Sequence, residues 1–447
     1  MTSGLWSNKQ LIRLIWPLII DQLLITLLGI VDTAMVAALG DEAVGGVSLV
    51  DSINMLVILF FSALTTGGAV ICSQYIGRGD NENASASAKL LVYLSTILSV
   101  ALMAIAAPAR VSLLRLIYGN LSSNVMASAE SYMFFSALSY PFISIYSAGA
   151  SIFRSMGDSK TCMFTSIFVN VLNVAGNALF IYGFGWGAGG AAVSTLVSRA
   201  LAAVLTFTLL YLRRRRCVIS IAGILRVRFD IGIIRSIMRV ALPNGAENAM
   251  FQIGKLALAR LVAVFGTAAI AGNAIGNIVV SIGNLPGMAI GTAMLTVIGQ
   301  SVGAGEYDAA SRYTGKLLKY SFIAVGSLNV LFALLMPWFL KLFALSDESA
   351  SIAYICGMIF CCFAVFIWTP AYCLPYALRA AGDGGHTMLV AAFAMWVFRV
   401  GGAYVLAYTT GLGAISIWVS MVCEWVVRGA FYVTRWKNGK WLRKRLI

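Results

Sequence analysis

The sequence is poor in charged residues and nearly lacks histidine. Only 11% of its 447 residues are charged, whereas an ordinary soluble domain carries about 25%. The single histidine, His386, has no paired cysteines beside it, and no serine or cysteine has a histidine and an acid placed to activate it. These shortages exclude a sizeable soluble domain. They also argue against an enzyme, a catalytic metal site or a resident cofactor.

The sequence is instead rich in apolar residues. They make up 60% of the chain, and the mean hydropathy is +0.88. A helix of about 20 residues crosses a hydrocarbon core of about 30 Å, and apolar runs of this length recur along nearly the whole chain. We therefore predict an all-α membrane protein with about twelve transmembrane helices, at 11–38, 46–75, 86–108, 130–152, 161–183, 188–212, 234–263, 272–300, 313–342, 350–378, 386–408 and 412–434.

The charge is strongly unbalanced, with a formal net charge of +15. Most basic residues lie in short gaps on one side of the helix ladder, including the run 213–216 and the tail 435–445, whereas the other side has only Arg110, Arg115 and Lys341. By the positive-inside rule, both termini lie in the cytoplasm. The basic residues are therefore topology signals rather than a nucleic-acid groove. We expect membrane lipids as partners and no nucleic acid.

An internal repeat organises the chain. At an offset of 226, Pro17 aligns with Pro243 and Asp21 with Glu247, and SQYIGRGD aligns with GQSVGAGE. At an offset of 225, FRSMGD aligns with LRAAGD. We therefore predict two homologous six-helix lobes, 1–212 and 234–447, joined by a basic cytoplasmic linker at 213–233. Because each lobe holds an even number of helices, the lobes share one orientation, an arrangement that favours alternating access.

Five acidic residues lie inside predicted helices: Asp21, Asp32, Asp51, Glu247 and Glu424. A charge there costs about 2.5 to 3.5 kcal/mol, so such residues normally face a cavity or a partner. Asp21 and Asp32 are 11 residues apart, which places them on one helix face about 16 Å apart. Asp51 lies at a similar depth to Asp32, and the two could share a proton or another cation. The alternative is that Asp32 is structural and caps broken helix backbone.

Charged residues in the second lobe suggest a further polar centre. Glu247 follows Pro243 as Asp21 follows Pro17, so it is a candidate second ion or substrate anchor together with Asp21. Lys255, two turns further on, is either part of this site or a structural partner that neutralises Glu247. Glu424 and Arg428 are four residues apart and predict a structural ion pair that Arg399 can join. The sequence assigns no role to Arg199, and that of Arg399 stays open.

Several stretches resemble the multidrug and toxic compound extrusion (MATE) family. They include VDTAMVAALGDEAVGGVSLV, SQYIGRGD, FRSMGDSKT, VNVLNVAGNALFIYG and ALPNGAENAMF, and the resemblance covers nearly the whole chain. It implies a two-lobe exporter in a bacterial cytoplasmic membrane. Such a protein expels organic compounds, mostly cationic and amphipathic, in exchange for Na+ or H+. We expect a monomer with small-molecule substrates.

The resemblance also implies site residues. Asp32 occupies the family's aspartate in VDT, fifteen residues after the kinking proline, and Asn173, Asn177 and Thr195 are implied as neutral ligands around it. Where some members carry a second aspartate, this chain has Asn177, so the choice between Na+ and H+ stays open. Two alternatives remain: a flippase for lipid-linked oligosaccharide or peptidoglycan precursors, which related proteins perform, and a gated channel without coupling.

Overall fold

The structure is a computed structural model that describes residues 6–119, 121–213, 218–224, 229–343 and 345–447. The described residues divide into two compact units. The N-terminal unit is Ile12–Ala241, and the C-terminal unit is Leu242–Ile447 together with Met1–Leu11. The boundary lies inside one helix. Within the expected linker at 213–233, residues 214–217 and 225–228 lie outside the described residues.

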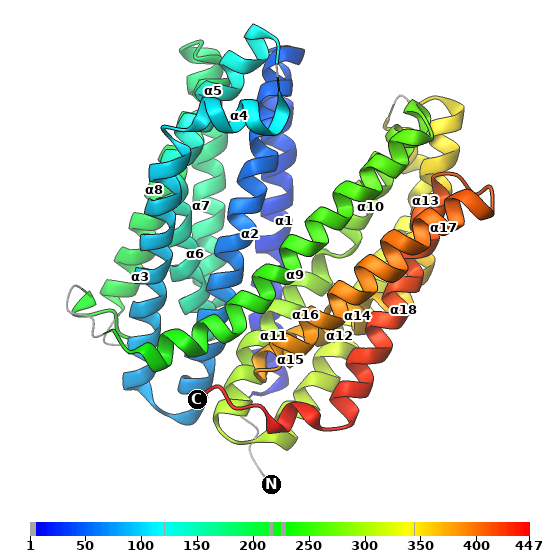
Figure 1. Ribbon diagram of the computed structural model, residues 1–447. Coiled ribbons are helices and arrows are strands. Elements are labelled where there is room, and N and C mark those ends of the chain that lie inside the picture. The colour runs from blue at the N-terminus through cyan, green and yellow to red at the C-terminus, as the bar shows by residue number, and fades with distance from the viewer. Residues whose placement is uncertain (1–5, 120, 214–217, 225–228, 344) are drawn as a thin grey trace. The chain divides into compact units, whose positions relative to one another are not determined.

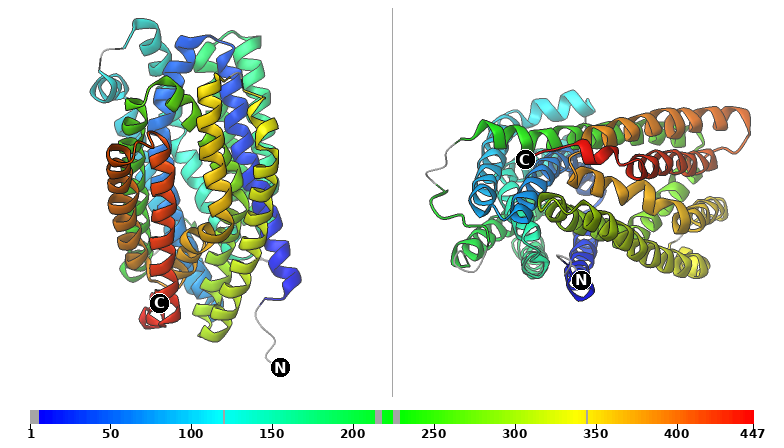
Figure 2. Two further views of the ribbon diagram at one scale, coloured as in Figure 1. Left: turned by 90° about the vertical axis from the view of Figure 1, so that its right-hand side faces the viewer. Right: turned by 90° about the horizontal axis from the view of Figure 1, so that it is seen from below.

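The N-terminal unit is a bundle of long helices that run roughly alongside one another (Figures 1 and 2). Helix α2 packs against α3, α5 and α6, and α8 packs against α5, α6 and α7. The bundle contains α1 (Asn8–Ala37), α2 (Asp41–Arg78), α3 (Asn81–Ala106), α4 (Arg110–Tyr118), α5 (Ser123–Leu138), α6 (Tyr140–Ser155), α7 (Ser159–Asn177), the π-helical turn η1 (Ala178–Gly183) and α8 (Gly187–Leu212).

The C-terminal unit begins within α9 (Ile231–Val264). Helix α10 packs against α13, α11 packs against α12 and α15, and α18 packs against α14 and the π turn η4. The remaining elements are α10 (Thr267–Gly283), α11 (Leu285–Gly303), α12 (Tyr307–Leu340), α13 (Asp347–Phe363), η3 (Ala364–Trp368), α14 (Thr369–Tyr372), α15 (Leu374–Ala380), α16 (Gly384–Phe393), η4 (Ala394–Gly401), α17 (Gly402–Thr409), α18 (Ile415–Lys437) and the short η5 (Lys440–Arg443).

The helical architecture confirms the predicted fold class. No strand occurs among the described residues, and ten of their helices are long and apolar enough to cross a membrane. Each of the twelve predicted segments corresponds to a helix or to a run of broken helices. The short helix α4, which lies across the ends of its neighbours in Figure 1, was not predicted. Its Arg110 pairs with Glu130 at 2.8 Å.

Prolines explain where two predicted helices divide. The segment predicted at 130–152 is α5 followed by α6, with Pro141 in the first turn of α6. The segment predicted at 272–300 is α10 followed by α11, with Pro286 in the first turn of α11. Proline lacks the backbone N–H that a helix interior needs, but it fits a first turn. In both cases the new helix therefore begins one residue before a proline.

Candidate ion and substrate sites

The residues expected around Asp32 meet in one hydrogen-bonded chain. Asn177 Nδ2 donates to Asp32 Oδ1 at 2.7 Å and lies 3.4 Å from Asn173 Oδ1, which brings α1 and α7 together. Asn173 Nδ2 in turn donates to Thr195 Oγ1 of α8 at 3.2 Å. Asn173 and Asn177 are buried, with exposed fractions of 3% and 1%. Three helices of the N-terminal unit thus place four of the expected residues at one centre.

Local structure explains how Asn177 reaches this position. Asn177 is the last residue of α7, immediately before η1, whose wider turn changes the direction in which the following side chains point. Its Oδ1 is buried and has no hydrogen-bond partner. Hard cations prefer carboxylate and carbonyl oxygens. The centre therefore offers a carboxylate together with an unused amide oxygen.

Asp51 belongs to a neighbouring group. Its Oδ1 accepts hydrogen bonds from Tyr132 at 3.1 Å and from Asn54 Nδ2 at 3.3 Å, and it makes no hydrogen bond to Asp32. Arg199 interacts electrostatically with both aspartates, and its guanidinium donates to Ser139 at 2.7 Å. Asp51 is thus an electrostatic neighbour of the Asp32 centre. Arg199, which the sequence left without a role, supplies a positive charge beside both acids.

Asp21 lies apart from the Asp32 centre. It is 3% exposed, and its nearest ionic partner is Arg154 of α6, at 3.9 Å from Oδ2. Its Oδ1 is buried without a hydrogen-bond partner. Asp21 therefore forms a loose ion pair near the middle of α1, three turns before Asp32.

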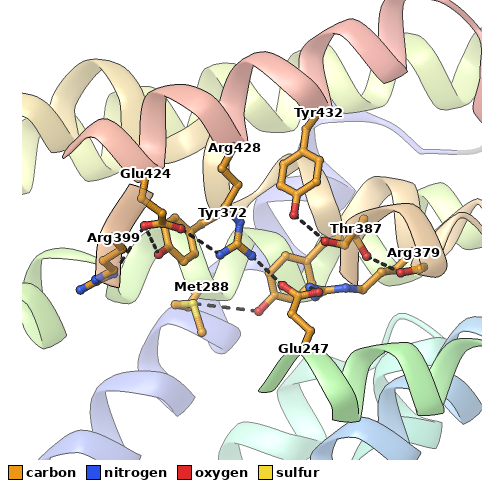
Figure 3. A network of polar contacts seen from close by, with 11 residues as sticks. Glu247, Met288, Tyr372, Arg379, Thr387, Arg399, Glu424, Arg428 and Tyr432 are labelled. Carbon is orange, nitrogen blue, oxygen red and sulfur yellow. Dashed lines mark hydrogen bonds and ion pairs between the residues drawn. The ribbon is translucent and has the colours of Figure 1, made fainter. Parts of the chain in front are cut away.

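Glu247 sits at the centre of a tight ion network in the C-terminal unit (Figure 3). Its Oε2 accepts from Arg379 at 2.7 Å, and its Oε1 accepts from Arg428 at 2.6 Å. Glu247, Arg379 and Arg428 are all at most 7% exposed. Because both carboxylate oxygens are bound by guanidinium groups, Glu247 is held by arginines within its own unit.

The expected pair in α18 is part of the same network. Arg428 lies 3.3 Å from Glu424, and Arg399 lies 3.5 Å from the other oxygen of that carboxylate. Tyr372 also donates to Glu424, at 3.3 Å, and its ring lies 4.6 Å from the Arg428 guanidinium. Arg379, Glu247, Arg428, Glu424 and Arg399 thus alternate in sign, and we call these five residues the C-unit network. The predicted contact of Arg399 with the pair is confirmed.

The expectation that Lys255 neutralises Glu247 is wrong. Glu247 forms ion pairs with Arg379 and Arg428 instead. The Lys255 ammonium lies 5.3 Å from the centre of the Phe251 ring. The repeat contained a signal for this arrangement. Arg379 aligns with Arg154 at an offset of 225, and Glu247 aligns with Asp21 at 226. Each repeat therefore pairs an acid four residues after a proline with the arginine of its RxxGD segment.

Comparison with known proteins places the chain in a family. The MatE family model matches residues 17–179 and again 243–405, which confirms the internal repeat at an offset of 226. The transporter YisQ of Bacillus subtilis is 27% identical over 97% of this chain and 95% of its own length. The probable multidrug resistance protein NorM of Thermotoga maritima is 26% identical over 98% of this chain and 94% of its own length.

Solved structures agree on the fold. An outward-facing multidrug resistance MATE transporter superposes with a TM-score of 0.91 at 22% identity, covering 98% of this chain and 97% of that one. A MATE protein crystallised in a bent conformation gives a TM-score of 0.90 at 22% sequence identity, covering 98% of this chain and 96% of that one. Its paired family matches, its helices and its relatives together identify this integral membrane protein as a member of the MATE family of efflux transporters.

Proposed function

We propose that this protein exports organic compounds across a bacterial cytoplasmic membrane in exchange for Na+ or H+ entering at Asp32. The observation that carries the proposal is the hydrogen-bonded chain from Asp32 through Asn177 and Asn173 to Thr195. A carboxylate inside a membrane protein is costly unless a cation or a proton visits it. The unused Oδ1 of Asn177 adds a neutral ligand beside it.

Coupling of solute export to cation entry requires that the cation and the solute favour different conformations of the protein. A cation that neutralises Asp32 removes a charge that Asn177 and the nearby Arg199 otherwise stabilise. If the occupied and empty centres favour different conformations, solute release becomes linked to cation entry, because a ligand shifts an equilibrium only by its difference in affinity between two states. Asp51 and Arg199 set the electrostatic field of this centre.

Cationic amphipathic compounds are the substrate class that we propose first. YisQ is a transporter, and NorM of Thermotoga maritima is a probable multidrug resistance protein. This supports efflux over the flippase alternative. The aromatic content of 11% provides rings suited to flat, positively charged molecules.

The test is Asp32→Asn, which keeps the shape of the side chain and its contact with Asn177 but removes the charge. In proteoliposomes with an imposed Na+ or pH gradient, we expect the variant to lose uphill export of a cationic dye while inserting normally. Asp41→Asn, at the exposed start of α2, is the matched control and should export as the wild type does. Full uphill export by Asp32→Asn would refute the proposal, and downhill movement alone in the wild type would indicate a channel.

A further inference from the structure

The C-unit network and its neighbour Lys255 carry an excess of positive charge. Three arginines and Lys255 face only two acids, Glu247 and Glu424, so the group has two more cations than anions. Asp383, four residues after Arg379, pairs with Arg435 at 2.7 Å. An uncompensated charge within a membrane protein is costly and normally marks a functional site. The group therefore lacks an anion.

The same residues have unused hydrogen-bond donors. The Nε atoms of Arg379, Arg399 and Arg428 are buried and have no hydrogen-bond partner. Arg379 and Arg428 are themselves only 7% and 4% exposed. Guanidinium donors bind carboxylate, sulfonate and phosphate oxygens in charge-assisted hydrogen bonds, and leaving a buried donor unused is unfavourable. Charge and donor geometry thus point to the same class of ligand.

Two of the cations gather on one aromatic ring. The ammonium of Lys255 lies 5.3 Å and the guanidinium of Arg399 lies 5.5 Å from the centre of the Phe251 ring. Lys255 is exposed and interacts unfavourably with Arg399, whose acidic partner is Glu424 at the long distance of 3.5 Å. Two like charges on one ring repel each other, and a second anion beside them would offset this repulsion. We call Phe251, Lys255 and Arg399 the Phe251 face.

Several charged residues of one repeat align with uncharged residues of the other. Gly176 approaches Ser194 and Gly402 approaches Ser420, which supports the offset of 226 in this part of the structure. At that offset three cations of the second repeat align with uncharged residues of the first: Lys255 with Gly29, Arg399 with Asn173, and Arg428 with Ala202. Two acids of the first repeat align with uncharged residues of the second: Asp32 with Leu258, and Asp51 with Asn277. Divergence from one ancestral repeat has thus made the first unit acidic and the second basic around their polar centres.

We propose that the Phe251 face binds the anionic group of an organic compound, a carboxylate, sulfonate or phosphate whose apolar part lies against the ring. The transported range then includes zwitterionic and acidic amphipathic compounds as well as cations. The consequence for transport rests on the proposed efflux function. The binding step does not, because it requires neither a gradient nor Asp32.

A pair of dyes that differ in one charge tests the site. Rhodamine 110 has a free carboxylate, and its methyl ester lacks it. We would measure the binding of both to the full-length protein in detergent by fluorescence anisotropy, using the wild type, Lys255→Gln and the control Arg260→Gln, which removes another exposed cation from α9. We expect Lys255→Gln to weaken binding of the free acid about tenfold, because the variant loses one charge-assisted hydrogen bond. Binding of the ester should be unchanged.

Each result decides the question. Equal effects on acid and ester, no effect on either, or the same loss in Arg260→Gln would overturn the proposal. Repeating the measurement in nanodiscs with and without phosphatidylglycerol separates two sources of the anion. If that lipid displaces rhodamine 110 from the wild type but not from Lys255→Gln, the face binds lipid headgroups and the assignment to exported compounds fails. Loss of efflux in Asp32→Asn leaves these binding results unaffected, so the two proposals can fail separately.

Discussion

Asp21 and Glu247 occupy equivalent positions, each four residues after a proline, yet their surroundings differ in strength. Asp21 lies 3.9 Å from one arginine and leaves an oxygen unpartnered, whereas Glu247 contacts two arginines at 2.7 and 2.6 Å. Ala202 replaces the second arginine, Arg428, at an offset of 226. The acid at this position therefore has a stronger structural role in the second repeat, as Glu247, than in the first, as Asp21.

This difference predicts unequal losses of stability. Removing one member of a buried ion pair costs about 3 to 5 kcal/mol, because the remaining charge is left uncompensated. We expect Glu247→Gln to lower the apparent melting temperature of the protein in detergent far more than Asp21→Asn does, since two guanidinium groups lose their carboxylate. Melting curves recorded from the two variants side by side provide the measurement. Similar shifts for the two would show that the additional arginine contributes no stability.

At the scale of whole elements, close approaches between helices depend on glycine. A Cβ atom on Gly67 of α2 would lie 2.6 Å from the carbonyl oxygen of Ile237 and 3.0 Å from the Cβ of Ala241, both in α9. Gly315 of α12 is exposed and has no atom within 4 Å of such a Cβ. The first glycine permits helix packing, whereas the second only lowers the helix propensity of α12.

Alanine at these two positions should have opposite effects. Gly67→Ala forces α2 and α9 apart and should destabilise the protein by about 1 to 3 kcal/mol, the usual cost of overpacking. Gly315→Ala should be neutral or stabilise α12 by up to about 1 kcal/mol. Thermal unfolding of both purified variants would measure the effects. An unchanged melting temperature for Gly67→Ala would contradict the close packing.

For the whole molecule, the distribution of basic residues predicts topology. Most lysines and arginines lie in the gaps on one side of the helix ladder, and we predict that this side faces the cytoplasm together with both termini. Green fluorescent protein fused after Ile447 should fluoresce, and alkaline phosphatase fused there should be inactive, because each reporter folds on only one side of the membrane. Active phosphatase would reverse the orientation.

The sequence by itself determined the helical membrane fold, the twofold repeat and the acids within the membrane. Hydropathy depends on composition over about 20 residues, and the repeat needs only alignment of the chain with itself. It also placed Asp32 with Asn173, Asn177 and Thr195, although only through resemblance to a family. The short helix α4 was missed because its nine residues are too few to form an apolar span.

Only the tertiary structure decided which charges meet. Glu247 pairs with Arg379 and Arg428, which lie 132 and 181 residues further along the chain, rather than with Lys255 on its own helix. Partner choice depends on which helix faces are brought within about 3 to 4 Å, and helical spacing specifies such distances only within one helix. For this reason the balance of charge in the C-terminal unit, with the anion site that we infer from it, became visible only once the helices were packed.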